Sequence, residues 1–153
     1  MDVSSGATCD VIARGAKLYV FPNSEVQAGL RMACLPVAVL EQNGDVDGIG
    51  RAVMDALRMF RTNVPFPEDY ERAANEVLKD TGFKNWRSFS KGAQRLGVRA
   101  EGAEIVVTPT VADARGGYGD LEDLSIRVRA DPATIGSAVV DALGKCQFRA
   151  RLG

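Results

Sequence analysis

Hydrophobic and polar positions follow patterns that predict both strands and helices along this chain. In Leu124–Arg129 (LSIRVR) they alternate strictly, so the predicted strand has one apolar face and one polar face. Cys34–Leu40 (CLPVAVL) is apolar throughout, which is typical of a central strand covered on both faces. Pro36 lies near the start of that segment, where a missing backbone donor is tolerated. We expect both strands to belong to one sheet.

Two further segments predict paired strands. Asp10–Pro22 (DVIARGAKLYVFP) holds two apolar stretches around Arg14-Gly15, as expected for a strand pair or a bent strand. Val98–Thr110 (VRAEGAEIVVTPT) is interrupted at Glu101-Gly102, which predicts a hairpin. Residues 109–120 are rich in glycine and long for a connection in a compact domain, so we expect a binding loop or a mobile loop there.

Helical periodicity and end signals predict three longer helices and one short helical turn. Asp47 is placed to cap the first helix, and Pro67 suits the first turn of the second. Asp131 followed by Pro132 suits the start of the third. The predicted helices span about residues 48–60, 67–80 and 132–146, and the short turn starts at Asn85 and buries Trp86 and Phe89.

The first and third of these helices carry nearly the same sequence. Ile49–Leu57 is IGRAVMDAL and Ile135–Leu143 is IGSAVVDAL, identical at seven of nine positions. Because the flanking sequence does not repeat, two interpretations stay open: convergence of two core-facing helices on small residues, or two strand-to-helix units packed alike on one sheet. In both, Gly50 and Gly136 lie where a missing side chain lets a helix approach the sheet closely.

Length and composition predict one domain, residues 1–153, with an α/β fold in which a mixed β-sheet is covered by three or four helices. The 19 Lys+Arg and 20 Asp+Glu are interspersed, which argues against a binder of duplex nucleic acid. The start of the chain lacks the features of a signal peptide, and the apolar run Met32–Leu40 is too short for a membrane span. The three cysteines form no CxxC pair, so we expect a reduced, cytoplasmic protein.

The absence of histidine narrows the possible chemistry further. It removes the commonest general base near neutral pH and the commonest zinc ligand. Asn43–Gly48 (NGDVDG) matches half of a calcium loop, but position twelve is Met54 instead of glutamate, and a turn with a helix cap explains the same residues. The glycine pairs at 48–50 and 117–119 lack a third glycine and are flanked by carboxylates that would repel phosphate. We therefore expect no metal and no cofactor.

Two functions stay open on the residues alone. A small carboxylate-dependent enzyme would use paired acids, and a ligand-binding or regulatory module would use the loop at Gly117. Helix capping, exposed helix faces and a solvated loop explain the same acids without any catalytic role. The candidate pairs are Asp45 with Asp47, Asp55 with Asp141, and Asp120 with Glu122 and Asp123.

Within Trp86–Cys146, the strings WRSFSKGAQRLGV, EIVVTPT, GGYGDL and PATIGSAVVDALGKC resemble the small bacterial immunity proteins of contact-dependent growth inhibition (CDI), of the CdiI type. In these systems of bacterial competition, a cytoplasmic partner binds and neutralises the toxin domain at the C-terminus of a large secreted effector. The resemblance implies a non-enzymatic toxin inhibitor whose partner is a protein, with no direct contact with nucleic acid or membrane. It transfers no catalytic or binding residue.

The toxin-binding surface is therefore predicted from chemistry. An inhibitor of a nuclease can lay carboxylates where phosphates would bind, and complementary charge also speeds association. The first predicted group combines an aromatic anchor with negative charge in one loop: Tyr118, Asp120, Glu122 and Asp123. The second group is Glu41, Asp45 and Asp47, and the polar face of the helix from Pro67, with Glu68, Glu71 and Glu76, is a competing surface.

Overall fold

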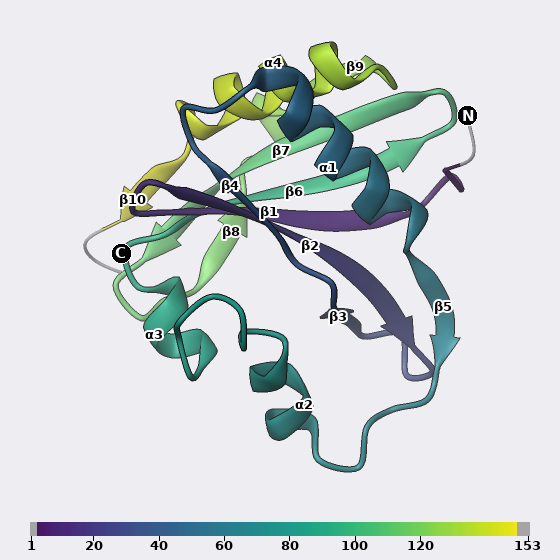
Figure 1. Cartoon of the computed structure of the whole chain (residues 1–153), viewed down its shortest axis with the longest axis vertical. Helices are drawn as coiled ribbons and strands as arrows, with labels where there is room; N and C mark the ends of the chain where they lie inside the picture. Colours follow the sequence, from purple (N-terminus) through teal and green to yellow (C-terminus); the bar gives the residue numbers. More distant parts are fainter. Residues whose placement is uncertain (1–2, 150–153) are drawn as a thin grey trace.

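Two antiparallel hairpins lie side by side at the centre of the molecule (Figure 1), in a computed structural model that describes residues 3–149. β1 (Thr8–Arg14) pairs with β2 (Lys17–Val26), and β6 (Gln94–Glu101) pairs with β7 (Glu104–Asp113). β1 and β6 also pair antiparallel, which joins the hairpins into one twisted sheet. The predicted Val98–Thr110 hairpin and the predicted strand pair around Arg14-Gly15 are confirmed.

Six short strands extend this sheet. β3 (Arg31–Ala33), β4 (Ala38–Glu41) and β5 (Arg61–Val64) pair with β2, whereas β8 (Tyr118–Asp120), β9 (Ile126–Arg129) and β10 (Gln147–Arg149) pair with β7. The β2–β5 and β7–β10 pairs are parallel and the other described pairs are antiparallel. The predicted mixed sheet in an α/β fold is confirmed.

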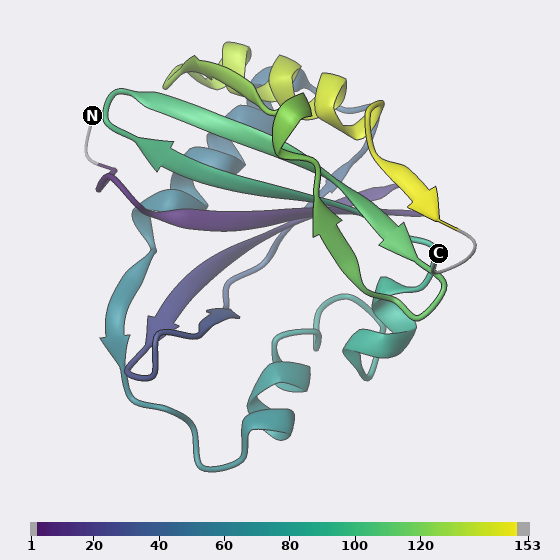
Figure 2. The same ribbon diagram turned by 180° about the vertical axis from the view of Figure 1, so that it is seen from behind.

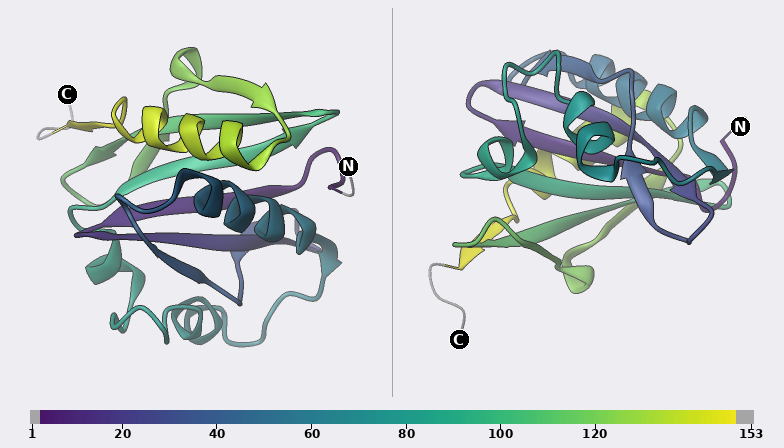
Figure 3. Two further views of the ribbon diagram at one scale, coloured as in Figure 1. Left: turned by 45° about the horizontal axis from the view of Figure 1, so that its top comes forward. Right: turned by 90° about the horizontal axis from the view of Figure 1, so that it is seen from below.

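The two longest helices, α1 (Val46–Arg58) and α4 (Pro132–Leu143), lie side by side across one face of the sheet (Figure 3). Their apolar stripes pack on the inward side chains of the central strands and form the main core. α1 starts earlier than predicted because Asp45, not Asp47, is its cap. The Asp45 carboxylate accepts hydrogen bonds from the backbone N–H groups of Asp47 and Gly48, each at 3.2 Å.

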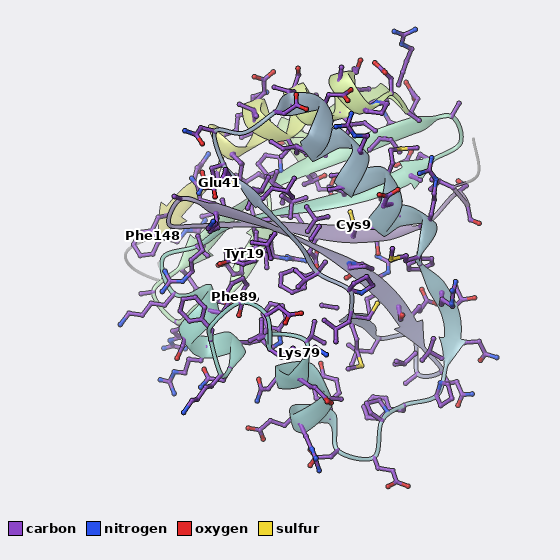
Figure 4. The ribbon with its side chains drawn as sticks, in the orientation of Figure 1. Cys9, Tyr19, Glu41, Lys79, Phe89 and Phe148 are labelled. Atoms are coloured by element: carbon purple, nitrogen blue, oxygen red, sulfur yellow. The ribbon has the colours of Figure 1, made fainter. Side chains whose placement is uncertain are left out.

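Two short helices cover part of the opposite face. α2 (Tyr70–Glu76) is shorter than the predicted helix over 67–80, because Asp69 caps its first turn and the chain leaves the helix at Val77. α3 (Trp86–Ser90) starts after Asn85, as predicted. Figure 4 shows Phe89 of α3 against Tyr19 of β2, with ring centroids 5.1 Å apart, in a second and smaller apolar cluster.

The predicted central strand at Cys34–Leu40 is wrong. Residues 34–37 lie between β3 and β4, and β4 is a short strand in which Val39 is 45% exposed. β3 pairs with the second half of β2 and β4 with its first half, so the segment passes along β2 in two pieces. Pro36 has no N–H to donate and falls at the break between these pieces.

The pairing pattern reveals a repeat that is longer than the nine matching helix residues. The strand order in the sheet is β4-β2-β1-β6-β7-β9. Along the chain, a hairpin, a strand that pairs with its second strand, and a helix occur twice, as β1-β2-β4-α1 and as β6-β7-β9-α4. The sequence next to the two helices does not repeat, but the hairpins further upstream do: residues 11–23 (VIARGAKLYVFPN) and 98–110 (VRAEGAEIVVTPT) are identical at six of thirteen positions. Both hairpins turn through Gly-Ala, with φ of +61° at Gly15 and +59° at Gly102. The interpretation as two units packed alike is confirmed.

The repeated glycines lie at the contact between the two helices rather than at the sheet. A Cβ atom on Gly50 would overlap the carbonyl group of Pro132, and one on Gly136 would overlap that of Val46. Each glycine is the fifth residue of its helix and faces the first residue of the other helix. This reciprocal close approach requires glycine at both positions, so the expectation of a helix–sheet contact is corrected.

Candidate functional site

We call β1-β2-β4-α1 the first copy of the repeat and β6-β7-β9-α4 the second copy. The side chains of the two copies are similar on the helix-covered face of the sheet and differ on the opposite face. The inward residues of the first hairpin have close counterparts in the second, such as Val11 with Val98 and Val20 with Val107, and all four are at most 2% exposed. The outward residues Ile12, Tyr19 and Phe21 of the first copy correspond to Arg99, Val106 and Thr108 in the second. α3 covers the apolar set, whereas Arg99 and Thr108 of the second copy are polar and Val106 is buried.

These polar groups form the floor of a cavity of about 190 Å³ on the face that Figure 2 shows. Its floor comes from alternate residues of β1, β2, β6 and β7, and β8 with the single-turn helix η1 (Glu122–Leu124) forms one wall. Its polar lining residues are Thr8, Asp10, Asn23, Arg31, Arg95, Arg99, Thr108, Asp120 and Glu122. We refer to this site as the β1–β6 cavity.

An ion pair crosses the floor of the β1–β6 cavity. Arg95 Nη2 lies 3.0 Å from Asp10 Oδ1, and the Asp10 side chain is 18% exposed. Burial raises the pKa of the Asp10 carboxyl above its ordinary value, Arg95 lowers it, and the carboxylate of Asp120 raises it. Asp10 and Asp120 therefore repel each other across the cavity.

Asn23 brings an unsatisfied polar atom to the same floor. Its side chain is buried, its Nδ2 donates to Thr8 Oγ1 at 3.0 Å, and its Oδ1 has no hydrogen-bond partner among the described residues. Of the two threonine hydroxyls that line the floor, Thr8 accepts this hydrogen bond and Thr108 lies 2.8 Å from the Ser125 hydroxyl. A buried acceptor without a donor is costly, so Asn23 Oδ1 favours a bound group that can donate.

Comparison with known proteins identifies the family. Residues 19–146 match the family CdiI, the CDI immunity proteins. The chain belongs to this family.

Solved structures show the CdiI fold of this chain in two further proteins. A protein of unknown function from Neisseria meningitidis is 18% identical, with a TM-score of 0.75 over 96% of this chain and 99% of the other. A chain in the CdiA-CT/CdiI toxin and immunity complex from Yersinia pseudotuberculosis is 15% identical, with a TM-score of 0.75 over 95% and 99%. No curated protein matches the sequence.

The first predicted group of toxin-binding residues is divided in this CdiI family member. Asp120 and Glu122 line the β1–β6 cavity, whereas Asp123 is exposed outside it. Asp120 makes no ion pair with any residue in the described part of the chain, and Glu122 lies 3.8 Å from Arg99. These two acids are the predicted residues that the fold brings together with Asp10.

Tyr118 lies elsewhere, and the predicted long loop at residues 109–120 is not a loop. β7 continues to Asp113, a four-residue turn follows, and β8 begins at Tyr118. Asp113 Oδ1 holds the turn by accepting from the N–H groups of Arg115 and Gly117, at 2.8 and 3.0 Å.

The Tyr118 hydroxyl donates to the Ser90 carbonyl oxygen at 2.8 Å. Tyr118 lies beside a second cavity of about 730 Å³, which is also lined by Arg87, Lys91, Arg115 and Phe148. Tyr118 is thus held in place instead of presented on a mobile segment.

The second predicted group lies near the start of α1 and is engaged locally. Glu41, labelled in Figure 4, pairs with Lys17, and Asp47 pairs with Arg51. Asp45 caps α1, which accounts for the half-match to a calcium loop. The competing acids, by contrast, make no ion pair with described residues: Glu68, which precedes α2, and Glu71 and Glu76 within it.

Sequence reasoning missed the cavity residues that come from β1, β2 and β6, namely Asp10, Asn23, Arg95 and Arg99. Polar residues at every second position of a strand whose other face is apolar were the available signal, as at Thr8 and Asp10. Within residues 3–149, no group of three or more cysteine and carboxylate side chains is arranged to hold a metal ion. None of the helices in that range combines the length and apolar character needed to cross a bilayer.

Proposed function

We propose that this chain binds and neutralises the toxin domain at the C-terminus of its cognate CDI effector, in the cytoplasm, and that the toxin domain is a nuclease. The family match over residues 19–146 carries the proposal. The neighbour from Yersinia pseudotuberculosis comes from a complex of a toxin with its immunity protein, which supports a protein partner.

The acidic groups around η1 support a nuclease as the target. A nuclease binds phosphates with basic residues, so an inhibitor gains from carboxylates that are free to meet them. Asp120 and Asp123 are exposed and make no ion pair with described residues. We propose that the edge formed by β8 and η1, where Glu122 lies between Asp120 and Asp123 in the sequence, meets the toxin first.

A binding and activity assay tests the function. The toxin domain encoded next to this chain is purified alone and mixed with the immunity protein. We expect a one-to-one complex by size-exclusion chromatography with light scattering, and complete loss of the toxin's degradation of DNA or RNA. A toxin that stays separate and active would contradict immunity, whereas a neutralised toxin that cuts no nucleic acid would contradict only the nuclease assignment.

A charge-reversal pair tests the surface. Asp120→Lys with Asp123→Lys is expected to slow association with a basic toxin about tenfold at low salt and to flatten its salt dependence. Asp55→Lys with Asp141→Lys is the matched control, because it changes the net charge equally on the outer surfaces of α1 and α4. Equal effects of both pairs on the association rate would refute this placement.

A further inference from the structure

We infer that the β1–β6 cavity receives the positively charged end of a lysine or arginine side chain from the toxin domain. The inference rests on the proposed function and names the chemistry of one contact within it. The chemistry of the cavity's acceptors, its volume and its charge pairing all support this occupant.

The free hydrogen-bonding groups of the cavity favour a donor. Asn23 Oδ1 is buried without a partner, and Asp10 uses only Oδ1 for Arg95. Asp120 adds a carboxylate that has no ion pair with described residues. Ammonium and guanidinium groups donate several hydrogen bonds and accept none, so they match three acceptors that lie around one space.

The volume fits the end of a side chain. The cavity measures about 190 Å³, enough for several water molecules. A guanidinium or ammonium group with its last methylenes fills such a space, and burial strengthens its interaction with the carboxylates.

The arginines around the cavity do not reverse its preference, because each already has a carboxylate partner. Arg95 pairs with Asp10, Arg99 lies 2.5 Å from Glu101, and Arg31 lies 3.9 Å from Glu25. Asp120 is the lining carboxylate left without a cation among the described residues. A bound cation would also relieve the repulsion between the carboxylates of Asp120 and Asp10, which adds to burial, the main cause, in raising the pKa of Asp10.

α3 covers the outward face of the first copy but contributes no residue to the lining of the cavity, so a partner can reach the cavity. In the first copy, Phe21 lies under α3 and packs on Phe89 with centroids 5.9 Å apart. Its counterpart in the second copy is Thr108, which lines the cavity. The polar residues Arg99 and Thr108 of the second copy therefore line a cavity instead of packing in the apolar core, as expected for a binding site.

The test compares two neighbouring acids of equal charge. Asp120→Asn removes the free carboxylate of the cavity, whereas Asp123→Asn removes an exposed carboxylate three residues away that does not line it. Binding to the toxin domain is measured by surface plasmon resonance at physiological salt. We expect Asp120→Asn to raise the dissociation constant at least tenfold, mainly through faster dissociation, and Asp123→Asn to change it less than twofold.

Methionine replacement of each toxin lysine and arginine then identifies the inserted side chain. One such toxin variant should lose affinity with the wild-type immunity protein but lose nothing further with Asp120→Asn. Equal effects of Asp120→Asn and Asp123→Asn, or tighter binding by Asp120→Asn, would overturn the cation site while leaving toxin binding intact. Failure of the wild-type protein to bind the toxin would overturn the proposed function and this inference with it.

Discussion

Gly50 provides the sharpest test of single-residue packing. Its missing side chain allows the backbone of Pro132 to approach α1, and an added methyl group would overlap backbone atoms that cannot rotate away. We expect Gly50→Ala to lower the free energy of unfolding by about 1–3 kcal/mol or more, measured by urea denaturation.

Gly48 in the same helix is the matched control for this prediction. A Cβ atom at Gly48 would meet only ordinary contacts, the nearest being Asp45 Oδ2 at 3.5 Å. Gly48→Ala should therefore leave stability unchanged or raise it by up to about 1 kcal/mol, because alanine favours the helix. Equal effects at both positions would show that helix propensity, not the contact with α4, governs Gly50.

The buried carboxyl of Asp10 predicts a pH dependence of stability. Burial is the main cause that raises its pKa in the folded protein, so the folded state holds this proton more tightly than the unfolded state does. The stabilisation from this proton is present at acidic pH and is lost as pH rises through the folded-state pKa. As pH rises from the unfolded-state pKa of Asp10 to its folded-state pKa, the free energy of unfolding of the wild type should fall relative to that of Asp10→Asn.

Thermal or urea unfolding of both proteins across pH 3 to 7 measures this difference, since all other titrating groups are shared. Asp120→Asn should also lower the pKa of Asp10, because Asp120 is among the groups that raise it. By NMR titration of the Asp10 carboxyl carbon, a pKa at or below its ordinary value in the wild type would contradict the first expectation, and an unchanged pKa in Asp120→Asn would contradict the second.

Residue-level reasoning found only part of the candidate site. Asp120 and Glu122 stand out in the sequence as acids beside glycines, and the fold brings them to the β1–β6 cavity. Asp10 and Arg95 are 85 residues apart and meet only because β1 pairs with β6. No local pattern contains that pairing, so the cavity was not predictable from single positions.

At the scale of elements, predictions succeeded where one local signal determined the structure. Asp131-Pro132 and a regular apolar stripe predicted α4, and the breaks at Arg14-Gly15 and Glu101-Gly102 between apolar runs predicted the two hairpins. The predictions failed where pairing between strands decided which residues form a strand. Cys34–Leu40 has the composition of a buried strand, but its partner β2 is long enough to hold two short strands in succession, and proline separates them.

The Gly-rich segment illustrates the same limit. Glycines at 116, 117 and 119 favour a loop, but pairing with β7 draws Tyr118–Asp120 into β8 and leaves only a four-residue turn. The repeat was likewise hidden, since only alternate, inward residues of the strands match between the copies. A comparison restricted to every second position would have extended the nine-residue match into the hairpins.

For the molecule as a whole, the two copies depend on each other for their core. β1 pairs with β6, α1 contacts α4, and the main apolar cluster draws residues from both. Cleavage between the exposed residues Lys91 and Gly92 would give fragments 1–91 and 92–153, each with half of that core. A folded chain of about 60 residues buries only about 60% of the surface that its unfolded form exposes, and here its inward face would also lie open.

We therefore expect neither fragment alone to unfold cooperatively, and an equimolar mixture to regain a cooperative transition by circular dichroism. The β1–β6 cavity combines Asp10 and Asn23 from the first fragment with Arg95 and Asp120 from the second. Toxin binding should then return only with the mixture, to a level that follows the refolded fraction. Cooperative unfolding of fragment 92–153 alone would show that one copy is an independent folding unit, and toxin binding by that fragment would place the recognition surface outside the shared cavity.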